Sequence, residues 1–194
     1  MSLVKLEKTG NVFTLTMDAG ENRWNTALVD ELIAALDEVE QNKGATALVT
    51  TGASEKFYSN GLDLDWRNSP ADFPEAGDPD SFHFMEFMAR MITLSVPTIA
   101  AVNGAAAGAG ANLALACDVV IASERAYFLQ AFTRIGLIPD AGGTYVMPRT
   151  MGMAKAMGAA LFADKISARQ ADNWGLIWEA VEDDQFDAHW KARA

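Results

Sequence analysis

Cysteine and histidine are scarce in this 194-residue chain, which has one cysteine and two histidines. One cysteine excludes a disulfide within the chain, and Cys117 lies in an apolar run expected to be helical. Such cysteine usage fits a reducing cytoplasm. His83 and His189 are far apart in the sequence, so the residue types of a zinc site are missing and we expect no metal.

Basic residues and long apolar runs are also few. The 15 lysines and arginines are outnumbered by 26 acids, which gives a net charge of −11. This balance argues against nucleic acid as a partner, although a local basic patch could still hold a polyanionic ligand. No apolar run is long enough to span a bilayer, and Met1 to Lys5 lead directly into a strand-like pattern without a signal peptide. We therefore expect a cytoplasmic protein with no membrane partner.

The residues that are present favour one globular α/β domain over 1–194, since 50% are hydrophobic and 21% charged. Apolar and polar residues alternate over Leu3–Lys8 and Val12–Met17, which predicts a β-hairpin. Helical spacing follows over Ala27–Glu40, and Ala45–Thr51 is a short apolar strand.

The rest of the chain repeats this order of strand, strand and helix. The polar residues Asp65 to Asp80 predict a loop long enough to be a lid. A spiral of ββα units suits the recurring order better than a doubly wound sheet. The further expected elements are a helix over Phe82–Leu94, strands over Thr98–Val102, Val119–Ala122 and Ala126–Leu129, a helix over Met153–Phe162, a helix capped by Ser167, and a last helix from Asp183.

A stretch of alanines and glycines from Gly104 to Asn112 follows the strand that Asn103 ends. Such small side chains leave backbone N–H groups open at the start of a helix, where they favour an anion or an oxygen that becomes negative. Close packing of a helix on a sheet is the simpler alternative. A dinucleotide-binding loop is a weaker match because Leu113 replaces its third glycine, and no Gly-Lys-Ser/Thr of a P-loop follows.

Two turns accompany this stretch. Asn60-Gly61 is either a simple hairpin turn or a turn that presents the Leu62 N–H inward. Pro139-Asp140 predicts a second turn, in which Asp140 either caps a helix beginning near Gly142 or supplies a carboxylate for chemistry.

In their order and spacing, the segments Ser59–Leu64, Asn103–Ala114 and Pro139–Thr144 resemble the crotonase (enoyl-CoA hydratase/isomerase) superfamily. From Val96 to Glu182 the chain looks most similar to isomerases of ring epoxides and double bonds in phenylacetate degradation. The segment from Asn60 to Leu64 is similar to that of Δ3,Δ2-enoyl-CoA isomerases. The resemblance implies a crotonase-like spiral of ββα units with C-terminal helices, a homotrimer or hexamer, and acyl-CoA thioesters of fatty acid metabolism as substrates.

The resemblance also implies roles for individual residues. The backbone N–H groups of Leu62 and Ala109 would form an oxyanion hole, and Asp140 would be the catalytic acid–base. Arg23 and Lys56 would be candidates for the phosphates of coenzyme A, which is part of the substrate, so no separate cofactor is expected. The remaining substrate-site candidates are Asn60, Gly61, Asp63, Leu64, Gly108 and Phe132.

The chain departs from the hydratases of this family, which carry glutamates at the positions of Asn112 and Phe132. Water addition needs two carboxylates, whereas one suffices to move a double bond, so an isomerase is favoured. Apolar neighbours should raise the pKa of Asp140. A weak or broad hydratase and a non-catalytic acyl-CoA-binding protein remain alternatives. A dehalogenase with Asp140 as nucleophile is less favoured, because those enzymes have tryptophan at Phe132.

Family members usually continue beyond the equivalent of Ala194 into helices that cover the acyl pocket. The resemblance therefore implies that the C-terminal helical part, from about residue 150, is incomplete here.

Overall fold

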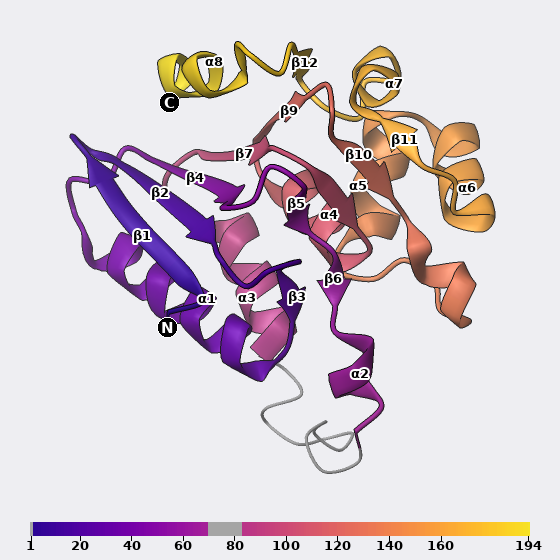
Figure 1. Ribbon diagram of the computed structural model, residues 1–194, viewed down its shortest axis with the longest axis horizontal. Coiled ribbons are helices and arrows are strands. Elements are labelled where there is room, and N and C mark those ends of the chain that lie inside the picture. The colour runs from indigo at the N-terminus through magenta and orange to yellow at the C-terminus, as the bar shows by residue number, and fades with distance from the viewer. Residues whose placement is uncertain (1, 70–82) are drawn as a thin grey trace.

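The computed structural model describes residues 2–69 and 83–194, and a six-stranded sheet runs through its centre (Figure 1). Its first two strands pair as the expected antiparallel hairpin, and every later strand joins in parallel. The strands, in spatial order, are β1 (Val4–Thr9), β2 (Val12–Met17), β4 (Ala47–Gly52), β7 (Thr98–Val102), β9 (Val119–Ser123) and β12 (Glu179–Val181).

After leaving strands of the large sheet, the chain forms a second sheet of four short strands. Strands β4, β7 and β9 are each followed by one strand of the second sheet, so the chain winds as a spiral and the expected fold class is confirmed. The four strands are β11 (Ile166–Ser167), β10 (Tyr127–Leu129), β8 (Ala105–Ala107) and β5 (Phe57–Ser59), and a separate parallel pair is formed by β3 (Arg23–Trp24) and β6 (Gly61–Leu62).

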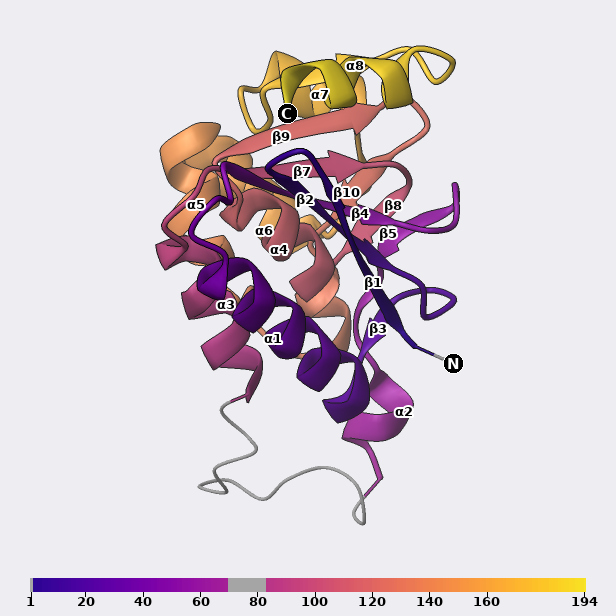
Figure 2. The same cartoon turned by 90° about the vertical axis from the view of Figure 1, so that its left-hand side faces the viewer.

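Helices cover both faces of the large sheet. Figure 2 shows α1, α3 and α4 together on one side and α8 on the other. None of the helices in the described ranges is both long and apolar enough to cross a membrane. Their bounds are α1 (Thr26–Gln41), α2 (Leu64–Arg67), α3 (His83–Thr93), α4 (Ala109–Ala116), the 3₁₀ helix η2 (Ala131–Ile135), α5 (Gly143–Thr150), α6 (Met153–Phe162), α7 (Ala168–Asn173) and α8 (Phe186–Arg193).

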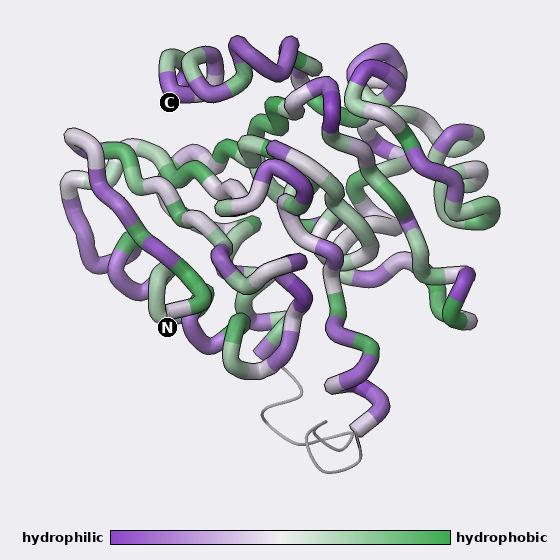
Figure 3. The backbone as a smooth tube through the Cα atoms, in the orientation of Figure 1, coloured by the Kyte–Doolittle hydropathy of each residue, from purple (hydrophilic) through white to green (hydrophobic). Residues whose placement is uncertain are grey.

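The apolar face of α1 forms part of the hydrophobic core. Asn25 caps this helix by accepting a hydrogen bond from the Leu28 N–H at 3.0 Å, and Leu28, Leu32 and Leu36 are fully buried on one face. Figure 3 shows the same separation over the chain, with hydrophobic residues along the inner strands and many hydrophilic ones along α8 and the edge strand β1.

Several local expectations were wrong. Asn60-Gly61 does not close a hairpin, because β6 pairs in parallel with β3. The expected loop from Asp65 begins as helix α2, since the Asp63 carboxylate accepts hydrogen bonds from two amides of its first turn. Residues 70–80 of that loop, and Phe82 of the expected helix, lie outside the described residues. Strands β8 and β12 were not expected, and the last helix starts at Phe186 instead of Asp183.

Candidate active site

The N-terminus of α4 lies at the centre of the candidate site. The first amides of this helix, beginning with Ala109, have no acceptor within the helix, and the first helical bond runs from the Asn112 N–H to the Gly108 carbonyl. Gly108 caps the helix with φ 54° and ψ −127° and without a side chain. Backbone donors at the positive end of the helix dipole are therefore available to a ligand.

Gly61 brings a second backbone segment against this helix start. Its φ is +72°, and a Cβ there would lie 2.6 Å from the Ala107 carbonyl oxygen and 2.9 Å from the Ala109 nitrogen. Only glycine fits both the left-handed backbone and this approach. The adjacent residue Leu62 is thereby held beside Ala109, as the inward-turn hypothesis expects.

The direction of the Leu62 amide follows from its neighbour. The Asp63 N–H donates to the Trp24 carbonyl of β3 at 2.9 Å. Successive amides of an extended segment point to opposite sides, so the Leu62 N–H points away from β3. Both amides of the expected oxyanion hole thus belong to residues on the wall of one pocket.

This pocket has a volume of about 230 Å³ and is mostly apolar. Most of the expected site residues meet there, and the acid Asp140 shares the wall with Leu62 and Ala109. The lining consists of Asn60, Leu62, Leu64, Gly108, Ala109, Ala131, Phe132, Arg134, Ile135, Leu137 and Asp140.

Asp140 does not cap the helix that follows it. Gly142 is the N-cap of α5 and makes no side-chain capping bond, so the capping alternative for Asp140 is wrong. Asp140 is an exposed residue that lines the pocket, yet partial desolvation raises the pKa of its carboxyl above the ordinary value. A hydrogen bond from its own backbone N–H opposes part of this rise. The carboxyl is thus open to a ligand and holds a proton more readily than a fully solvated aspartate.

Besides Gly61, three other candidates are not among the residues that line the pocket. Asp63 serves α2 as its N-cap. Arg23 is paired with Glu21 at 2.7 Å and lines an adjoining groove of about 440 Å³ that shares Asn60, Leu62 and Leu64 with the pocket. Lys56 is exposed and lines neither of these two hollows.

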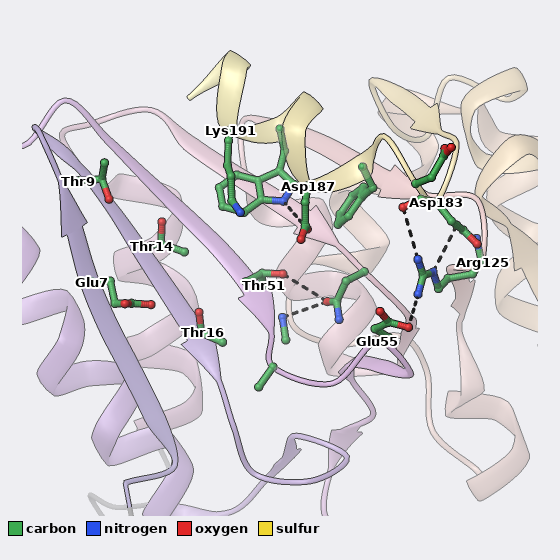
Figure 4. Close-up of a pocket in the computed structure, with 16 residues that line it drawn as sticks. Glu7, Thr9, Thr14, Thr16, Thr51, Glu55, Arg125, Asp183, Asp187 and Lys191 are labelled. Carbon is green, nitrogen blue, oxygen red and sulfur yellow. Dashed lines mark hydrogen bonds and ion pairs between the residues drawn. The ribbon is translucent and has the colours of Figure 1, made fainter.

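A larger hollow of about 490 Å³ lies on the other face of the large sheet, between the hairpin and α8 (Figure 4). Its wall carries threonines and charged groups, and Arg125 is paired there with Glu55 at 2.7 Å and with Asp183 at 3.3 Å. Neither Leu62 nor Ala109 lines this hollow, and five of its lining residues are acids: Glu7, Glu55, Asp183, Asp184 and Asp187. We therefore place the chemistry in the smaller pocket.

The sequence reasoning missed two buried amides behind this pocket. The sequence alone draws attention to Asn112 only because it is not an acid, and it gives no reason to single out Gln130. Both are at most 2% exposed and bonded to each other. The available signal was a polar residue inside an otherwise apolar helix, because buried polar groups need partners.

A comparison with protein families now identifies the fold. The family model described as "Enoyl-CoA hydratase/isomerase" matches residues 7–194. The chain belongs to this family. The resemblance to the crotonase superfamily is thereby confirmed. The protein belongs to a family of enzymes whose members act on acyl-CoA thioesters.

Individual relatives point to both activities of the family. The chain is 48% identical over 198 residues to a Rhodobacter capsulatus protein named "Probable enoyl-CoA hydratase", covering 98% of this chain and 73% of that one. It is 43% identical over 179 residues to the Escherichia coli 1,2-epoxyphenylacetyl-CoA isomerase, covering 89% and 67%. A crystal structure of an enoyl-CoA hydratase from Bacillus anthracis superimposes with a TM-score of 0.90 at 29% identity, covering 98% and 74%.

Proposed function

We propose that this protein is an acyl-CoA isomerase that shifts a double bond, converting 3-enoyl-CoA into 2-enoyl-CoA or rearranging a ring-epoxide acyl-CoA. The observation that supports it most is the single pocket wall shared by Leu62, Ala109 and Asp140. The two positions where hydratases of the family carry glutamate hold Asn112 and Phe132 instead. An amide and a phenyl ring do not take a proton from water.

The double-bond shift needs one base and one place for negative charge. The Asp140 carboxylate removes a proton from C2 of a 3-enoyl thioester, and the electron pair passes to the thioester oxygen. The N–H groups of Leu62 and Ala109 hold this dienolate oxygen. The same carboxyl returns the proton to C4, so the double bond ends between C2 and C3 and nothing is gained or lost. A positioned acid–base contributes roughly 10²–10⁴-fold, and each oxyanion donor roughly 10²–10³-fold.

The two neighbouring hollows suit the two ends of the substrate. Phe132, Ile135 and Leu137 give the smaller pocket an apolar wall for the acyl group. Arg23 stands at the adjoining groove, where it can meet a phosphate of coenzyme A if it exchanges its bond to Glu21. Coenzyme A belongs to the substrate in this proposal, and no further cofactor takes part.

Hydration of 2-enoyl-CoA is the second candidate, favoured by the name of the relative at 48% identity. The experiment that separates the two uses 3-enoyl-CoA esters of graded length beside crotonyl-CoA. Isomerisation is measured as a rise in ultraviolet absorbance, because its product is conjugated. Hydration is measured as a fall in absorbance, because it removes the conjugated double bond of crotonyl-CoA. We expect isomerisation to be much faster. Comparable hydration would favour the hydratase, and binding without any turnover would favour a non-catalytic protein.

A further inference from the structure

Asn112 links helix α4 to the segment that carries Asp140. It is 1% exposed, and its Nδ2 donates a hydrogen bond of 2.8 Å to the Asp140 carbonyl. Its Oδ1 accepts a hydrogen bond of 2.8 Å from Gln130 Nε2. Both atoms of the Asn112 amide are therefore in use, and the amide has one orientation.

The turn after Asp140 is built around this link. The Asp140 carbonyl also accepts from the Gly143 N–H at 2.8 Å. Ala141 and Gly142 have φ values of +46° and +84°, a backbone that non-glycine residues seldom adopt. A Cβ on Gly143 would lie 2.5 Å from Asn112 Nδ2, so the turn packs directly on the amide.

Asn112 lies one helical turn after Ala109 on α4. The same helix thus presents the Ala109 amide to the pocket and holds the backbone of Asp140, the acid that lines the same pocket. Behind it, Gln130 is 2% exposed, and its Oε1 has no hydrogen-bond partner among the described residues. Burying an amide oxygen without a hydrogen-bond partner costs free energy. An apolar side chain in the same place would not have this cost.

We propose that Asn112, oriented by Gln130, is a positioning residue that sets the Asp140 carboxyl at a fixed distance from the Ala109 amide. This inference rests on the proposed function, because it gives Asn112 a role through Asp140. Asn112 itself is not among the residues that line the pocket.

The test compares Asn112→Ala, which removes the donor, with Asn112→Asp, which replaces it by an acid. We expect kcat for 3-enoyl-CoA to fall roughly 10–100-fold in both, with little change in KM, since misplacement of a catalytic group acts on the chemical step. In Asn112→Asp alone, the acid limb of the pH–rate profile moves to higher pH because a second negative charge raises the pKa of Asp140. Asn173→Ala, on the exposed end of α7, is the control and keeps the wild-type rate.

A merely structural role predicts a different pattern. Both variants would then melt at a lower temperature but keep the wild-type kcat and pH profile well below that temperature, and this result would overturn the proposal. If neither variant folds, Gln130→Met decides, because it keeps the volume and removes the donor to Asn112. A lower kcat at unchanged KM supports the proposal, and a wild-type kcat refutes it.

Asp140→Asn separates this proposal from the function on which it rests. An active Asp140→Asn refutes the isomerase mechanism itself. An inactive Asp140→Asn beside fully active Asn112 variants refutes only the positioning role.

Discussion

At the scale of single residues, the glycines Gly61 and Gly110 determine how closely the two segments that carry Leu62 and Ala109 approach. A Cβ on Gly110 would lie 2.3 Å from the Ser59 carbonyl oxygen, and one on Gly61 would meet Ala107 and Ala109. In both cases the nearest atom belongs to the backbone, which cannot move aside as the end of a side chain can. The pocket therefore depends on two residues whose contribution is the absence of a side chain.

Gly110→Ala should accordingly lower the free energy of unfolding by roughly 1–3 kcal/mol, as overpacking does. Urea denaturation measures this loss. The matched control is Gly158→Ala in α6, where the nearest atom to the new Cβ is 3.9 Å away. This control should be neutral or gain up to about 1 kcal/mol from helix propensity. Equal effects of the two substitutions would contradict the packing described here.

The raised pKa of Asp140 has a consequence for stability. Because the folded state holds this proton more tightly than the unfolded chain, the ionised carboxylate disfavours folding at neutral pH. Asp140→Asn should therefore be slightly more stable than the wild type near pH 7. The gain is small since the residue is exposed, and it should vanish as the pH falls below the ordinary aspartate range. Urea titrations at several pH values measure it, and a pH-independent gain would contradict this explanation.

At the scale of elements, α8 closes the outer face of the large sheet. Phe186 and Trp190 pack there with Val49, Ile99 and Ile121 in a second, smaller core. Asp183, just before α8, accepts hydrogen bonds from the Ser123 hydroxyl and, at 3.0 Å, from the Arg125 backbone N–H. These contacts tie the last helix to the end of β9.

Asp183→Asn tests the contribution of these hydrogen bonds to stability. The hydrogen bond from Ser123, followed by those from Arg125, holds the pKa of Asp183 below its ordinary value. A lowered pKa contributes stability above the unfolded value that is lost as the pH falls through the folded value. We expect a loss of about 0.5–1 kcal/mol near pH 7 that disappears in acid, measured by urea denaturation. The neighbouring Asp184→Asn is the control, and an equal loss there would contradict the assignment.

The elements also show what could be predicted from the sequence. Strand β7 and helix α6 were predicted at their observed bounds, and Ser167 caps α7 as expected, because the signals for each are local. Pairing of β6 with β3 joins Gly61 to Arg23, and no local pattern encodes such a partner. Strand β8 consists of three alanines, which carry no periodicity.

The same division holds for the candidate site. Leu62, Ala109 and Asp140 could be named from glycines, a turn and a resemblance. The bond from Asn112 to the Asp140 carbonyl could not, because it joins residues 28 positions apart.

At the scale of the whole molecule, apolar side chains lie exposed on and near α6. Ile138 is 77%, Phe162 74% and Met153 65% exposed. Exposed apolar side chains can take part in association between chains, and members of this family usually form oligomers. We predict a homotrimer or hexamer, which light scattering should show as three or six times the chain mass of 20.9 kDa. A monomer at micromolar concentration would contradict this prediction.

The central claim is that Asp140 moves the proton while the Leu62 and Ala109 amides hold the thioester oxygen. The most direct measurement compares the wild type, Asp140→Asn and the exposed Asp164→Asn in the ultraviolet assay with 3-enoyl-CoA, together with calorimetric binding of a saturated acyl-CoA. We predict that Asp140→Asn loses roughly 10²–10⁴-fold in rate while its affinity for the acyl-CoA stays near that of the wild type, and that Asp164→Asn is unaffected. An Asp140→Asn enzyme as fast as the wild type would contradict it.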